Sequence, residues 1–142
     1  MLDANRLSTP SWSCIHFTGA DAIRPDLSSA LETADIALFN LRGDELRSSL
    51  DVFRALAEAM AFPNYYGMNW DATEECLRDL GDWRPANGYV LFVHDAEWLW
   101  RQAYEPMGKL AEVWLVVAQE WARDDTAFHL VFVGSTPALS AA

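Results

Sequence analysis

Three short apolar runs stand out in the pattern of hydrophobic and polar positions along this chain. They cover residues 36–41, 88–93 and 128–133, and turn-forming or charged residues bound them. Runs of this length, nearly continuous rather than alternating, predict strands that are buried on both faces of a sheet. Strands of this kind are typical of parallel sheets that carry helices on their faces.

Two helices are predicted between the first and the second run. Ser48 and Asp51 have the spacing of a capping box, and apolar positions then recur at helical spacing until Pro63 ends the helix. A turn-rich loop follows. A second helix is predicted over residues 69–80, with apolar residues on one side, acidic residues on the other and Gly81 as its stop.

Helical spacing also fills the interval between the second and the third run. We expect a helical turn over residues 96–101 and a long helix from near Pro106 to Asp124. The predicted order is strand, two helices, strand, helix, strand. This alternation predicts an α/β fold with a three-stranded parallel sheet, right-handed crossovers and three to four packed helices.

The two ends of the chain carry weaker patterns than its middle. We expect residues 1–35 to form an N-terminal extension, with a short edge strand over 11–17 and one or two helical turns over 25–31. Residues 36–134 form the predicted domain, and the small residues of 135–142 predict a loose tail. One domain suits a chain of 142 residues, of which 51% are hydrophobic.

The charge of the chain is strongly negative. Lys and Arg number 10 against 21 Asp and Glu, which gives a formal net charge of -11. This charge argues against a nucleic-acid partner and against an anionic membrane surface, because both are bound through Lys and Arg. It fits a basic protein partner and equally fits simple solubility, so its sign alone does not choose between the two.

The cysteines and the N-terminus favour a cytoplasmic protein. Cys14 and Cys76 form no CxxC pair, and reduced thiols are their simplest interpretation. The first residues lack the basic-then-apolar pattern of a secretory signal. No apolar run approaches the roughly 18 residues that a membrane span needs.

Acidic residues are concentrated in the second predicted helix. Residues 71–82 hold five of them against a single basic residue, Arg78. Asp71 and Glu75 are four positions apart, so their side chains stack on one side of the helix and destabilise it in isolation by roughly 0.2–0.5 kcal/mol. The acids therefore indicate either a surface that binds cations or an ordinary solvated face that complements the helix dipole.

The loop before this helix carries a specific motif. Residues 62–72, Phe-Pro-Asn-Tyr-Tyr-Gly-Met-Asn-Trp-Asp-Ala, followed by Cys76 and Leu77, resemble the loop and second helix of the barstar family. The similarity in element order runs from residue 36 to residue 134. The resemblance implies a three-stranded parallel sheet with packed helices and an inhibitor of a small basic bacterial ribonuclease. In the family, carboxylates of the loop and helix take the positions of RNA phosphates and pair with Arg, Lys and His of the enzyme.

The resemblance also implies a site that binds the partner. Its residues are Tyr65, Tyr66, Gly67, Asn69, Asp71, Glu74, Glu75 and Asp79. Asp71 and Glu75 are the expected central anchors, and Glu120 is the candidate for an acid that the family carries near the end of its last long helix. The chain departs from the family's barnase inhibitors at Glu74, where they carry Trp, and at Glu75, where they carry Asp. The departures leave the identity of the ribonuclease open.

Several residues of this segment have structural interpretations as well. One tyrosine of the pair is expected to pack inward while the other faces a partner. Gly67 is expected to serve backbone geometry, and Asn69 to cap the helix. Trp70 and Cys76 lie on the apolar side and are expected in the core.

Three other functions compete with inhibition. An enzyme is disfavoured: His94, Asp95 and Glu97 follow a predicted strand, but no nucleophile elbow, phosphate loop, dinucleotide fingerprint or metal-ligand spacing accompanies them. We expect no catalysis, metal or cofactor. An acidic binding or immunity module for a basic protein that is not a ribonuclease fits the same scaffold. A subunit that oligomerises through Trp98 and Trp100 is the third, whereas the inhibitor is expected to be a monomer when free.

Overall fold

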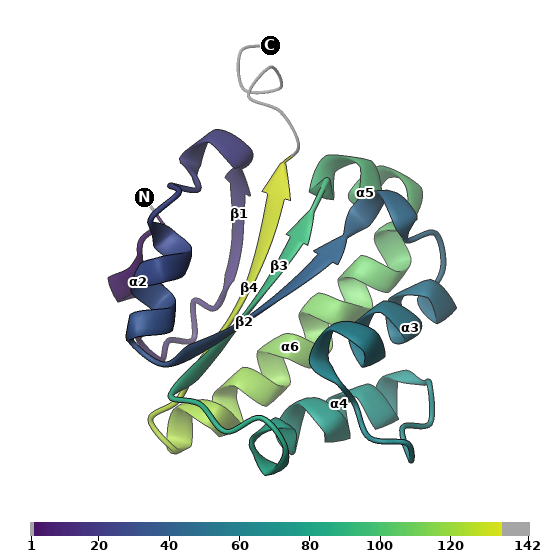
Figure 1. The fold of residues 1–142 in the computed structure, drawn as a ribbon. Helices are drawn as coiled ribbons and strands as arrows, with labels where there is room; N and C mark the ends of the chain where they lie inside the picture. The colour runs from purple at the N-terminus through teal and green to yellow at the C-terminus, as the bar shows by residue number, and fades with distance from the viewer. Residues whose placement is uncertain (1, 135–142) are drawn as a thin grey trace.

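A parallel four-stranded sheet forms the centre of the protein (Figure 1). The computed structural model describes residues 2–134. The strands lie in the order β1-β4-β3-β2, and every neighbouring pair is parallel. Their bounds are β1 Ile15–Gly19, β2 Ile36–Arg42, β3 Gly88–His94 and β4 Ala127–Gly134. The three predicted apolar runs are β2, β3 and β4, each within one residue of its predicted bounds.

The fourth strand corrects the prediction of a three-stranded sheet. β1 pairs with β4 from Ile15 against Leu130 to Gly19 against Gly134. It is a short edge strand, as expected, but it begins four residues later than the predicted range of 11–17, and it lacks the nearly continuous burial of β3 and β4. Its partner lies at the other end of the chain, so the local pattern does not reveal the pairing.

The described part of the chain holds six α-helices, where three or four were predicted. α3 (Ser49–Met60), α4 (Trp70–Arg78), α5 (Ala96–Gln102) and α6 (Tyr104–Arg123) lie on one side of the sheet, and α1 (Ala4–Leu7) and α2 (Leu27–Thr33) on the other (Figure 1). Three 3₁₀ turns connect these elements: Ala20–Ala22, Gly43–Glu45 and Leu80–Asp82. The two additional helices, α1 and α2, are short: α2 overlaps the helical turns expected over residues 25–31, whereas α1 was not predicted. Such short helices form through tertiary packing rather than through a long local pattern.

The helix starts follow the predicted signals with small differences. Ser48 Oγ accepts a hydrogen bond from the Asp51 N–H (3.2 Å) at the start of α3. The Asp51 carboxylate accepts from the Arg47 N–H (3.0 Å), one residue earlier than a capping box predicts. α6 begins at Tyr104, so Pro106 lies inside its first turn, where a missing N–H is tolerated.

The end of α4 differs from its prediction. The helix ends at Arg78, and the 3₁₀ turn Leu80–Asp82 follows it. A Cβ at Gly81, the predicted stop, would lie 3.2 Å from the ring of Trp121 on α6. Gly81 therefore provides room for α6 to approach α4 rather than a helix cap.

Both faces of the sheet are buried. The larger core lies under α3 to α6 and includes the stacked rings of Trp114 and Phe128, whose centroids are 4.1 Å apart. A second cluster on the other face consists of Leu7, Leu27, Leu31, Ile36, Val90, Phe92, Val131 and Val133. The first 35 residues, expected as an extension, thus cover one face of the sheet, which explains why β3 and β4 are apolar on both sides.

Two expectations concern the membrane and the C-terminus. Within residues 2–134, no helix combines the length and the apolar composition that crossing a membrane requires. The predicted loose tail over 135–142 lies outside the described residues.

Candidate functional site

The loop between α3 and α4 is tied to α4 by its capping residue. Asn69 Oδ1 accepts a hydrogen bond from the Ala72 N–H (2.8 Å), so Asn69 is the N-cap that the sequence predicts. Its Nδ2 donates to the Gly67 carbonyl (3.3 Å) on the loop side. One side chain therefore sets the angle between the loop and the helix.

The tyrosine pair divides into an inward and an outward member. The Tyr66 ring packs edge-on against Phe62, with centroids 4.8 Å apart. The Thr73 hydroxyl donates to the Asn69 carbonyl (2.8 Å), so the Tyr66 hydroxyl, 2.6 Å away, donates to Thr73. Tyr65 is 67% exposed. Tyr66 thus anchors the loop to α4, and Tyr65 is available to a partner.

The role expected for Gly67 needs correction. Its φ is not positive; the left-handed residue of this loop is Met68, at φ 57°. A Cβ at Gly67 would lie 3.3 Å from Asn69 Nδ2 and 3.5 Å from the Ala72 Cβ. Glycine therefore leaves space beside the cap, and no special backbone angle requires it.

The inner side of α4 is held by the core. Trp70 packs edge-on against Phe53 of α3, at a centroid distance of 4.8 Å. Cys76 is 2% exposed, and burial raises the pKa of its thiol, which keeps it protonated. The Trp121 indole N–H donates to the Leu77 carbonyl (3.1 Å) and joins α6 to the last turn of α4. Packing of this side turns the acids of α4 outward.

Four acids on the outer side of α4 and in the turn after it carry free charge. Asp71, Glu75 and Asp82 are exposed, and Asp79 is half-buried. In the part of the chain that the structure describes, none of the four forms an ion pair. Tyr65 lies near three of them: desolvation, Cys76 and the charges of Asp79, Asp82 and Glu75 raise the pKa of its phenol. We call these four carboxylates the acidic row.

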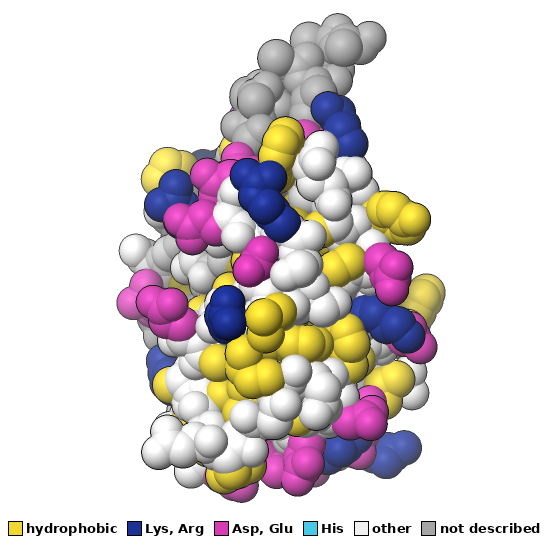
Figure 2. Space-filling view, turned by 90° about the vertical axis from the view of Figure 1, so that its right-hand side faces the viewer, with side chains coloured by type: hydrophobic (Ala, Val, Ile, Leu, Met, Phe, Trp, Pro, Cys, Tyr) yellow, Lys and Arg dark blue, Asp and Glu magenta, His cyan; other side chains and the backbone are white. Residues whose placement is uncertain are grey.

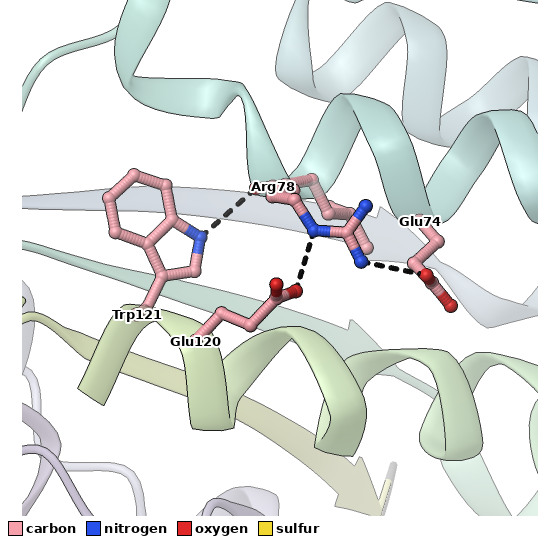
Figure 3. A network of polar contacts seen from close by, with 5 residues as sticks. Glu74, Arg78, Glu120 and Trp121 are labelled. Atoms are coloured by element: carbon pink, nitrogen blue, oxygen red, sulfur yellow. Dashed lines mark hydrogen bonds and ion pairs between the residues drawn. The ribbon is translucent and has the colours of Figure 1, made fainter. Parts of the chain in front are cut away.

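A fifth acid, Glu74, is already paired with a basic side chain of the protein itself. Arg78 Nη2 donates to Glu74 Oε2 (2.8 Å), and Arg78 Nε donates to Glu120 Oε2 (2.6 Å) of α6 (Figure 3). These two hydrogen bonds raise the pKa of Arg78. The Glu74–Arg78 pair has helical i,i+4 spacing, which is a signal visible in sequence. The structure adds Glu120, which lies beside α4 but is not free.

The other candidate chemistry does not converge on a site. His94 Nε2 lies 2.8 Å from Asn40 Oδ1 at the ends of β3 and β2, and burial lowers its pKa. His16 and His129 lie on β1 and β4, where their ring nitrogens are 2.8 Å apart, a contact that the sequence does not predict. Among residues 2–134, no group of three or more His, Cys, Asp or Glu side chains is placed to hold a metal ion.

The face of the molecule at the right-hand side of Figure 1 combines apolar and charged side chains. Figure 2 shows hydrophobic side chains gathered in the middle of this view, with acidic and basic side chains around them. Partner-binding surfaces commonly have an apolar centre and a polar rim.

Comparisons with known proteins agree with this architecture. The structure of the Aeropyrum pernix ORC2 protein in its ADP form is similar, with a TM-score of 0.61 and 13% sequence identity. The similarity covers 96% of this chain and 40% of that one, and at this identity it concerns the fold alone. A comparison with curated proteins gave no match. The profile described as Barstar (barnase inhibitor) matches residues 36–133, which include the loop, α4 and Glu120. The chain therefore belongs to the barstar family.

Proposed function

We propose that this protein inhibits a basic ribonuclease by covering its active site with the outer side of α4. The family is described as one of barnase inhibitors, which supports an inhibitory role in general. The observation that carries the proposal is the acidic row, whose carboxylates point away from the core and lack internal cations among the described residues. No catalytic step and no cofactor take part.

Carboxylates suit this role because an RNA-cleaving site presents cations arranged for phosphates. An ionised carboxylate has two acceptor oxygens and accepts two parallel hydrogen bonds from one arginine. Asp71 and Glu75 are the central anchors in this proposal, and Asp79 extends their row. Within residues 2–134, no ion pair has to break before these three acids meet a partner.

The surroundings of α4 support tight binding through preorganisation. The Asn69 cap, the Tyr66–Thr73 hydrogen bond and the Trp121–Leu77 hydrogen bond hold both ends of α4 and its loop. A surface that is ordered before binding loses less conformational entropy on binding. The net charge of -11 adds long-range attraction to a basic enzyme and speeds encounter.

An inhibitor of this kind has to act in the compartment where its ribonuclease could cleave cellular RNA. We propose a cytoplasmic immunity protein that acts as a monomer and forms a one-to-one complex with a basic ribonuclease, a partner class that includes ribonuclease toxins. The longer Glu75 side chain and the engaged Glu74 depart from the family's barnase inhibitors, so the identity of the ribonuclease is left open.

The first experiment captures basic proteins from the source cells on the immobilised full chain. The captured protein is then assayed for cleavage of a fluorescent RNA while this chain is added in measured amounts. Loss of cleavage near one equivalent supports the proposal. A captured partner that cleaves no RNA contradicts it and favours the alternative, an acidic module that binds another kind of basic protein.

A further inference from the structure

Arg78 places a positive charge inside an otherwise acidic surface. Its guanidinium lies between α4 and α6, where Glu74 and Glu120 each accept one hydrogen bond from it. The three side chains are 38%, 35% and 37% exposed, respectively for Arg78, Glu74 and Glu120. Arg78, Glu74 and Glu120, which we call the triad, thus lie at the surface beside the acidic row and not in the core.

The triad changes which acids a partner can use. Each glutamate in it has one oxygen bonded to Arg78, at 2.8 Å for Glu74 and 2.6 Å for Glu120. A partner cation that approached either glutamate would compete with a guanidinium held by charge-assisted hydrogen bonds from two helices. The acids of the row have no such competitor within residues 2–134.

We infer that Arg78 is a specificity-determining residue that withholds Glu74 and Glu120 from the ribonuclease. This inference rests on the proposed function. A ribonuclease with a cation opposite the triad meets the charge of Arg78, and apposed like charges disfavour a complex. The preferred partner is a basic ribonuclease whose cations lie opposite Asp71, Glu75, Asp79 and Asp82, with a neutral or acidic group opposite Arg78.

The first test reads the carboxylates directly and needs no enzyme. A hexa-arginine peptide is added to the full chain while the carboxyl ¹³C signals of Asp and Glu are followed by NMR. In the wild type, the signals of Asp71 and Glu75 are expected to shift, and those of Glu74 and Glu120 to stay within the scatter of remote acids. In Arg78→Gln, all four are expected to shift. Equal shifts of all four signals in the wild type would overturn the inference.

The second test measures specificity with barnase as the probe. Arg78→Gln is expected to bind barnase at least about tenfold more tightly than the wild type, since two further carboxylates become available. Arg24→Gln is the matched control, because it removes the same charge from an exposed arginine just before α2, and α2 lies on the opposite side of the sheet from α4 (Figure 1). Its gain is expected to stay below about threefold. No gain for Arg78→Gln, or an equal gain for Arg24→Gln, contradicts the inference.

Two further points keep the tests decisive. If Arg78→Gln does not fold, Arg78→Met replaces it. Methionine is also a long side chain that suits a helix, but it cannot donate hydrogen bonds to Glu74 and Glu120. Failure of the proposed function has a different signature: the wild type then inhibits no ribonuclease, while the carboxyl signals still divide between the acidic row and the triad.

Discussion

Neighbouring side chains of α4 have different roles because the helix turns each toward different surroundings. Asp71 and Glu75 face solvent, whereas Thr73 and Cys76 are buried. Thr73 accepts a hydrogen bond from the Tyr66 hydroxyl and Cys76 packs in the core, so both residues stabilise the fold. Substitution of Asp71 or Glu75 therefore tests binding without testing stability.

Asp71→Ala is expected to weaken inhibition of the cognate ribonuclease by about 2–4 kcal/mol, the range of a central interface anchor. The free energy of unfolding is expected to change by less than about 0.5 kcal/mol, because the side chain is exposed. Inhibition constants and urea denaturation measure the two effects. Glu58→Ala, an exposed acid on α3, is the control. Unchanged inhibition by Asp71→Ala would remove Asp71 from the proposed site.

The buried histidines form a chain of hydrogen bonds with fixed proton positions. His129 Nε2 lies 2.8 Å from the Thr9 carbonyl and must donate to it. In the neutral ring, His129 Nδ1 is then an acceptor for the N–H of His16 Nε2. Burial, the ring of His129 and the charge of Arg6 lower the pKa of His16 to about 4. Burial also lowers the pKa of His129, so both rings are neutral at pH 7.

These pKa values predict a stability that falls on acidification. The unfolded chain takes up protons near the ordinary value of 6.5, whereas folded His16 does so only near 4. The contribution of His16 to the free energy of unfolding is therefore full above pH 6.5 and declines between pH 6.5 and 4, by about 3 kcal/mol. Urea denaturation across this range measures the slope. His16→Gln is expected to flatten it, and an unchanged slope in that variant would contradict the assignment.

At the scale of single elements, the loop and α4 behave as one unit. Asn69 caps the helix and contacts Gly67, while Tyr66 reaches Thr73 one turn into α4. Loss of the cap loosens the first turn, where Asp71 lies. The position of Asp71, the proposed main anchor, therefore depends on Asn69, a residue that need not touch the partner.

Asn69→Ala is expected to lower the free energy of unfolding by about 1 kcal/mol, the usual cost of removing an N-cap. Inhibition is expected to weaken as well, since the first turn of α4 is then less ordered before binding. Thermal denaturation and inhibition assays measure the two effects. Asn69→Ser keeps a cap and serves as the control. If Asn69→Ser loses as much free energy of unfolding and as much inhibition as Asn69→Ala, capping is not the cause.

At the scale of the whole molecule, the proposed inhibitory surface on α4 and the N-terminal helices α1 and α2 lie on opposite sides of the sheet (Figure 1). α1 and α2 cover the face formed by Val90, Phe92, Val131 and Val133. Without that cover, apolar side chains of β3 and β4 would meet water. The first 35 residues therefore support the site indirectly, through the sheet on which α4 and α6 pack.

Leu31→Ala is expected to lower the free energy of unfolding by about 2–5 kcal/mol, because Leu31 is 0% exposed in the second core. Leu50→Ala, at a residue 44% exposed, is the control and is expected to cost less than about 1 kcal/mol. Urea denaturation measures both. Inhibition per folded molecule is expected to persist in Leu31→Ala. Equal costs for the two variants would show that α2 does not stabilise the sheet.

The local sequence determined the elements whose signals are short in range. The apolar runs that became β2, β3 and β4 were predicted within one residue, and the Asn69 cap was predicted because capping involves residues three apart. The placement of Asp71 and Glu75 on one outward side of α4 followed from their i,i+4 spacing. In each case, the interacting residues are neighbours along the chain, so their spacing alone specifies the geometry.

Contacts between distant residues were decided only by the tertiary structure. β1 joins the sheet beside β4, the ring of His16 contacts the ring of His129, and Glu120 of α6 accepts a hydrogen bond from Arg78 of α4. The sequence placed Glu74 and Glu120 among the candidate acids, but their engagement depends on how α6 packs against α4. Such contacts join residues far apart in sequence, so only the tertiary fold of the whole chain brings them together. They also decide function, because a charged side chain is available to a partner only if no distant residue has already paired with it.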